Sequence, residues 1–174
     1  MKNSPLAFLA FVFSFVLLVS QAIYGASAVA IIRPASQSKV WGTVRFETEN
    51  DGVKVTGTLN NLKPGLHGFH VHEFGDCTAA DGSSAGGHYN PTDVAHGNPM
   101  DNIPHHIGDL GNIEVPSSGI VKINKFVSGI NLIGVDTIIG RGLIVHADPD
   151  DLRTQPSGAS GARIGCGVIG IAKP

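Results

Sequence analysis

The chain has 174 residues, with 12 lysines and arginines, 14 aspartates and glutamates and 8 histidines, so its net charge at pH 7 is −2 with neutral histidines. It contains no basic stripe or tail, which argues against nucleic acid or an anionic membrane surface as a partner. The 23 glycines and 10 prolines are spread throughout the chain, and no long amphipathic helical pattern is visible.

Residues 1–28 have the layout of a secretory signal peptide. Lys2 is their only charged residue, an apolar run of 14 residues covers 6–19, and small residues follow, including the A-x-A site Ala26-Ser27-Ala28. An uncleaved membrane anchor is the alternative, but this run is shorter than the roughly 18–20 residues that span a bilayer. We therefore predict cleavage near residues 25–28 and export to the periplasm or the extracellular space. The remaining residues 29–174 suffice for one domain with its own core and no membrane association.

Short alternating or β-branched runs predict the strands of this domain, and turn sequences such as "ENDG", "LKPG" and "PSSG" separate them. The runs are 28–32, 39–47, 53–59, 65–74, 119–127, 142–147 and 166–172. Seven or eight short strands of this kind are typical of an all-β, antiparallel sandwich or barrel.

Two long segments interrupt the strand pattern. Residues 75–104 are rich in Gly, Asn, Asp and Pro and carry His88 and His96, and a second segment rich in Gly, Pro and Asp covers 147–162. A structureless loop of about thirty residues is uncommon in a compact domain unless it is functional or disordered. We predict functional loops, because a bound metal would supply the order that hydrophobic burial cannot.

The sequence "LHGFHVH" places His70 and His72 two residues apart on a predicted strand. Successive side chains alternate between the two faces of a strand. Phe69 and Val71 then form the core face, together with His67, which we interpret as a core histidine held by backbone hydrogen bonds. His70 and His72 project outward together, about 7 Å apart. Such a pair is either solvated or aimed at one metal.

The other histidines outside the presumed core gather at strand ends and in or just after the first loop. They are His88, His96, His105, His106 and His146, and Asp109 follows His106 by three residues. Together these side chains predict a histidine-rich metal site, since imidazole donors suit zinc, copper, iron or nickel. Two alternatives are disfavoured, because a cupin needs Glu three or four residues after the second histidine and a metallo-β-lactamase needs H-x-H-x-D-H, whereas this chain reads "HVHEFGDC".

The two cysteines, Cys77 and Cys166, lie 89 positions apart. In an exported protein, a disulfide between them is favoured over two buried free thiols. In the chain-entropy model, closing a loop of this length removes on the order of 4.5 kcal/mol of denatured-state freedom.

The chain resembles the copper/zinc superoxide dismutases in six motifs, which occur in the family's order and spacing. They are "GFHVHEFGD", "GGHYNP", "HGNP", "HIGDLGN", "IIGRGLIVHADPDDL" and "GARIGCGVIGIA". The resemblance covers Val29 to Ala172. It implies an eight-stranded antiparallel Greek-key sandwich or barrel, immunoglobulin-like, with two long functional loops. It also implies an oxidoreductase that converts superoxide into dioxygen and hydrogen peroxide and protects against oxidative damage.

The resemblance further implies one copper and one zinc ion per subunit. Copper would be bound by His70, His72, His88 and His146, and zinc by His88, His96, His106 and Asp109, so that His88 bridges the two ions. Asp150 would accept hydrogen bonds from His70 and His96, and Cys77 and Cys166 would form the family's intrachain disulfide. His105 matches no family role and is predicted to be a surface residue.

The resemblance implies catalytic roles for His88 and Arg163. His88 would leave the reduced copper, take a proton and pass it to the departing peroxide, and Arg163 would guide superoxide to the copper. The 147–162 segment is several residues shorter than in cytosolic members and lacks their Glu-Glu…Lys cluster, for which Arg153 is a candidate replacement. Cys77 directly follows Asp76, a spacing that is similar to bacterial secreted forms. A non-catalytic metal-binding protein with the same fold is the alternative function, and the sequence leaves a monomer and a homodimer open.

Overall fold

The computed structural model describes residues 26–173. These residues form eight strands and one short 3-10 helix. The elements are β1 (Ser27–Pro34), β2 (Trp41–Glu49), β3 (Gly52–Asn60), β4 (Gly65–His72), η1 (Ser83–Ala85), β5 (Asp109–Val115), β6 (Val121–Ser128), β7 (Gly142–His146) and β8 (Arg163–Ile171). None of the helices in this part of the chain is long and apolar enough to cross a membrane. Most of the proposed signal peptide, residues 1–25, lies outside the described residues.

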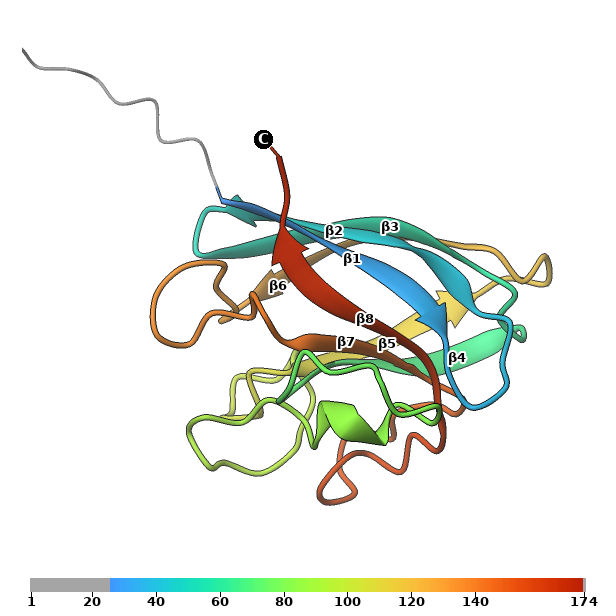
Figure 1. The fold of residues 1–174 in the computed structure, drawn as a ribbon. Coiled ribbons are helices and arrows are strands. Elements are labelled where there is room, and N and C mark those ends of the chain that lie inside the picture. Colours follow the sequence, from blue (N-terminus) through green and yellow to red (C-terminus); the bar gives the residue numbers. More distant parts are fainter. Residues whose placement is uncertain (1–25, 174) are drawn as a thin grey trace, which may run out of the picture.

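All strand pairs are antiparallel, and the strand order is β5-β4-β7-β8-β1-β2-β3-β6. Figure 1 shows two layers, with β1, β2, β3 and β6 facing β4, β5 and β7, and β8 pairs with a strand of each layer. The barrel is nearly closed, because the edge strands β5 and β6 lie next to each other without pairing. The Lys125 ammonium of β6 donates a hydrogen bond to the Leu110 carbonyl of β5 across the gap between them. The prediction of an all-β, eight-stranded antiparallel barrel is confirmed.

Seven of the strands coincide with the predicted runs, and β5 was missed. Its sequence, "DLGNIEV", carries Gly111 and Asn112 where regular alternation would place strand-forming residues, so the pattern shows only at Ile113 and Val115. The strand nevertheless forms, because it pairs with β4 from Gly65 to His70.

The core lies between the two layers and is filled by the inward-facing side chains of every strand. The largest of these include Ile32, Phe46, Leu59, Phe69, Leu110, Leu143 and Ile169, all at most 1% exposed. Phe69 and Val71 face this core as predicted. His67 does so too: its Nδ1 lies 2.7 Å from the His146 carbonyl oxygen and its Nε2 lies 2.9 Å from that of Lys63, which confirms a core histidine held by the backbone.

The outer face of β4 is covered by the two long loops, 73–108 between β4 and β5 and 147–162 between β7 and β8 (Figure 1). His70 and His72 point to this face, yet both are buried because the loops lie over them. The barrel therefore supplies one rigid wall of a closed site, and the loops supply the other.

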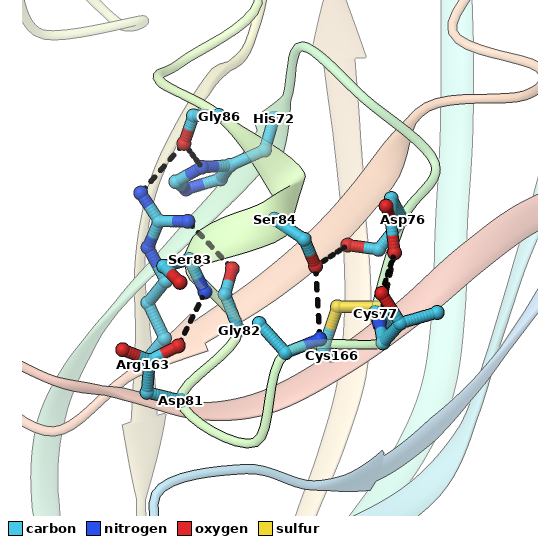
Figure 2. The surroundings of a disulfide bond; sticks show 12 residues. His72, Asp76, Cys77, Asp81, Gly82, Ser83, Ser84, Gly86, Arg163 and Cys166 are labelled. Carbon is cyan, nitrogen blue, oxygen red and sulfur yellow. Dashed lines mark hydrogen bonds between the residues drawn. A yellow bond between two sulfur atoms is a disulfide. The ribbon is translucent and has the colours of Figure 1, made fainter.

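A disulfide ties the start of the 73–108 loop to β8. Cys77 and Cys166 are bonded, with their Cα atoms 5.8 Å apart, and the described residues contain no free cysteine. Figure 2 shows the bridge beside Ser84, whose hydroxyl donates to the Asp76 carbonyl and accepts from the Ala79 N–H. The bridge thus holds the loop that carries His88 against the strand that carries Arg163.

Reducing this disulfide should destabilise the protein, because a closed loop of 89 residues limits the freedom of the unfolded chain. We expect the metal-free protein to lose about 2–5 kcal/mol of unfolding free energy and its Tm to fall by about 5–15 °C. Thermal unfolding followed by circular dichroism, with and without a phosphine reductant, measures this. The reductant should not affect a Cys77→Ser/Cys166→Ser double variant, and an equal Tm for reduced and oxidised wild type would contradict the prediction.

Candidate metal centre

Two neighbouring strands place three histidines on one outer face. His70 and His72 alternate along β4, which pairs with β7 so that His72 lies opposite Gly142. His146 ends β7, at an irregularity in the ladder to β8. The 73–108 loop adds His88, which forms an isolated β-bridge with His72. Residues from distant parts of the chain therefore converge above β4.

These four histidines, His70, His72, His88 and His146, form a first donor cluster, in which one ring nitrogen of each lies within 4.8 Å of the others. The outward-facing nitrogens have partners: His70 Nε2 lies 2.8 Å from Asp150 Oδ2, and His72 Nδ1 lies 3.0 Å from the Gly86 carbonyl oxygen. The inward-facing Nε2 atoms of His72 and His146 are 3.3 Å apart. Donating the outer N–H leaves the inner nitrogen with a free lone pair, as a metal ligand requires.

A second donor cluster surrounds the carboxylate of Asp109, the first residue of β5. Its Oδ1 lies 2.8 Å from His88 Nδ1, 2.9 Å from His96 Nδ1 and 3.4 Å from His106 Nδ1. Its Oδ2 accepts hydrogen bonds from the N–H groups of Gly97 and His106. Three imidazoles and one carboxylate oxygen form a set of four donors that suits zinc.

His88 belongs to both clusters, because its two ring nitrogens point in different directions. Nδ1 faces Asp109, and the ring centroid of His88 lies 4.1 Å from that of His70 in the first cluster. Three buried ring nitrogens of the two clusters have no hydrogen-bond partner among the described residues: His70 Nδ1, His88 Nε2 and His106 Nδ1. Buried polar atoms are rarely left unpaired. Their placement fits bound metal ions in both clusters.

Burial keeps three histidines of the first cluster neutral. It lowers the pKa of His70 to about 4 and that of His146 to about 3, and it holds the pKa of His72 well below the ordinary value. These imidazoles are therefore unprotonated at neutral pH and available to a metal without prior loss of a proton.

The second cluster is electrostatically different, because two carboxylates flank His96. Burial opposes the charged form of His96, but hydrogen bonds to Asp109 and Asp150 outweigh it and raise the pKa to about 9. Burial likewise opposes ionisation of the two carboxyl groups, yet the histidine hydrogen bonds lower the pKa of both Asp109 and Asp150 well below the ordinary value. The two carboxylates therefore favour positive charge at His96.

Asp150, in the 147–162 loop, lies between the clusters. Its Oδ2 contacts His70 Nε2 at 2.8 Å and its Oδ1 contacts His96 Nε2 at 2.9 Å. The Asn112 side chain fixes the Asp150 backbone from β5, accepting from its N–H at 2.8 Å and donating to its carbonyl at 2.9 Å. Gly158 has a φ of +66°, and a Cβ there would lie 1.8 Å from Asp150 Oδ1, so only glycine leaves room for this carboxylate.

Arg163, the first residue of β8, is half-buried beside the first cluster. Its guanidinium donates to the carbonyl oxygens of Gly82 and Gly86, at 2.6 Å each. Figure 2 shows that the Gly86 carbonyl contacts both Arg163 and the His72 ring. Burial lowers the pKa of Arg163, but arginine remains charged at neutral pH. A fixed positive charge therefore lies next to a ring of the first cluster.

The structure brings the seven predicted metal-ligating residues together in the two clusters, and Asp150 contacts a ring of each. His105 lies outside both clusters, with its Nδ1 3.2 Å from the Ile103 carbonyl oxygen. Arg153 is exposed on the 147–162 loop. Sequence reasoning missed Asn112 and Gln155, whose side-chain amides hold the backbones of Asp150 and His96. No local pattern could have found them, because each contact joins residues far apart in the chain.

A family model described as copper/zinc superoxide dismutase matches residues 40–169, most of the chain. The match spans β2 to β8 and includes both donor clusters. Proteins of this family are oxidoreductases that act on superoxide and use copper and zinc. The chain belongs to the copper/zinc superoxide dismutase family.

Proposed function

We propose that this chain dismutates superoxide, two superoxide anions and two protons giving one dioxygen and one hydrogen peroxide, with one copper and one zinc ion per subunit. The proposed copper ligands are His70, His72, His88 and His146, and the proposed zinc ligands are His88, His96, His106 and Asp109. The supporting observation is that two buried donor clusters share His88 and contain three buried ring nitrogens without a hydrogen-bond partner among the described residues.

The chemistry of the donors supports this assignment of copper to the first cluster and zinc to the second. Four imidazoles without a thiolate suit a copper ion that visits two oxidation states, and the set containing Asp109 suits zinc. When bound, copper would supply the one-electron chemistry, and zinc, which has no accessible second oxidation state, would supply charge and structure.

His88 is the proposed carrier of a proton to the product. Its Nδ1 lies 2.8 Å from Asp109 Oδ1, which fixes the ring, while Nε2 faces the first cluster without a protein partner among the described residues. A proton held at Nε2 would lie where peroxide must be protonated before it leaves. Asp150 is the proposed orienting group, because it fixes the tautomer of both His70 and His96.

Arg163 is the proposed guide for the superoxide anion. Its two hydrogen bonds to loop carbonyls hold the guanidinium in one position beside His72. A fixed positive charge raises the local concentration of a small anion, and salt screens this effect. The 147–162 loop lacks the family's usual charged cluster, so we assign any additional steering from this loop to the exposed Arg153.

We also propose that the protein is exported from the cytoplasm. The disulfide supports a compartment that is not reducing, and the composition of residues 1–28 supports a cleaved signal peptide. Mass spectrometry of the protein recovered outside the cytoplasm should find a mature chain that begins between residues 26 and 29. Recovery of an uncleaved chain in the membrane fraction would contradict this.

A superoxide-consumption assay tests the proposed activity directly. Protein loaded with copper and zinc should consume superoxide far faster than the same concentration of chelated copper, and the metal-free protein should be inactive. If the loaded protein is no faster than chelated copper, the chain is a metal-binding protein without catalytic activity.

Replacing His146 with alanine should remove copper and spare zinc, because His146 belongs to the first cluster alone. We expect turnover to fall more than about 100-fold, with zinc content near that of the wild type. Metal analysis by mass spectrometry, together with the superoxide assay, measures both. His105→Ala is the matched control, since this histidine lies outside both clusters and its loss should change neither metal. Equal loss of both metals from His146→Ala would refute the assignment.

Reversing the charge at Arg163 should slow the reaction and alter its response to salt. We expect Arg163→Glu to lower kcat/KM by about 10- to 100-fold and to flatten or invert the fall of the rate with ionic strength. Arg45→Glu makes the same charge change on β2, in the other layer of the barrel, and should keep the wild-type salt profile. A normal salt profile for Arg163→Glu at full copper content would exclude Arg163 from the guiding role.

A further inference from the structure

The side chain of Gln155, in the 147–162 loop, reaches across to the 73–108 loop and binds the backbone of His96. Its Oε1 accepts the His96 N–H at 2.8 Å, and its Nε2 donates to the His96 carbonyl at 2.9 Å. The second proton of Nε2 is used as well, since this nitrogen lies 3.1 Å from the Arg153 carbonyl oxygen. An N–H can only donate and a carbonyl can only accept, so these partners fix which end of the amide is oxygen.

His96 depends on this contact, because it lies in a stretch without regular secondary structure. Among the described residues, Gln155 is the only hydrogen-bond partner of the His96 backbone. The ring is held separately, with Nδ1 2.9 Å from Asp109 Oδ1 and Nε2 2.9 Å from Asp150 Oδ1. Gln155 therefore fixes the main chain of His96, and the two carboxylates fix its ring.

We propose that Gln155 is a positioning residue for the zinc site, which sets zinc affinity by holding the main chain of His96 in its binding position. This inference rests on the assignment of His96 to zinc in the proposed function. With the backbone held by Gln155 and the ring held by the two carboxylates, little of His96 has to be ordered when the ion binds, so the entropic cost of binding is smaller.

The effect should be specific to zinc. Asp150, which contacts the copper-side His70, is anchored to β5 by the bidentate contact of Asn112 and does not need Gln155 to hold its position. Loss of the Gln155 amide should therefore free the backbone of His96 while the His70–Asp150 contact remains.

Gln155→Met tests the proposal, because methionine keeps the length of the side chain and removes both hydrogen bonds to His96, together with the one to the Arg153 carbonyl. We expect zinc affinity, measured by competition with a chromophoric chelator, to fall about tenfold and copper affinity to stay within about twofold. Hydrogen exchange of the His96 amide in the zinc-loaded protein should become faster. Thr154→Val is the matched control, since the Thr154 hydroxyl donates to Asp151 within the same loop and contacts no residue of the two clusters that the structure describes, and it should leave zinc affinity unchanged.

Gln155→Glu is a second variant, which can keep the hydrogen bond to the His96 N–H but not the one to the His96 carbonyl. It serves as the test if the methionine variant does not fold. It keeps an acceptor for the His96 N–H but turns a carboxylate oxygen toward the His96 carbonyl, so we expect zinc to bind at least as weakly as in Gln155→Met. Zinc affinity within twofold of wild type in the folded variants, or an equal loss in Thr154→Val, would overturn the inference. Neither the metal-affinity measurements nor the hydrogen-exchange measurement uses superoxide. A failed dismutation assay would therefore overturn the proposed function and leave this inference standing.

Discussion

Two buried carboxylates, Asp109 and Asp150, hold the two donor clusters together. Six histidine rings lie beneath the loops, and burying that many polar nitrogens is unfavourable unless they have partners. Asp109 contacts three of these rings and Asp150 contacts two, and His96 contacts both carboxylates. Because each carboxylate is also fixed by backbone N–H groups, the rings are oriented before any ligand arrives.

The barrel and the loops divide the work of building the site. Strands β4, β5 and β7 supply His70, His72, Asp109 and His146, whose spacing is fixed by sheet register. The loops supply the remaining donors. They are held by the Cys77–Cys166 bridge, by the Arg163 hydrogen bonds, and by the side-chain amides of Asn112 and Gln155. Long loops without regular structure become ordered here because their polar groups find partners in the barrel.

Much of this architecture could be predicted from the sequence, since alternation along a strand is a local property. It gave seven strands and the opposite orientations of His67 and the His70–His72 pair, but it failed at β5, where Gly111 and Asn112 hide the pattern. Periodicity could not choose between His105 and His106, and the family resemblance was needed to predict that His106 joins the second cluster. Neither periodicity nor the family resemblance predicted the roles of Asn112 and Gln155. Their partners lie 38 and 59 positions away, and nothing in the sequence distinguishes these amides from other polar side chains.

The close approach of Gly158 to Asp150 limits how the 147–162 loop can diverge. Even an alanine at position 158 would displace the carboxylate that orients one ring in each cluster. Among descendants of this protein, the loop can vary in sequence and charge only where it makes none of these contacts, so Asp150, Gln155 and Gly158 have to stay. A library that randomises this loop to change substrate access should therefore keep these three codons constant.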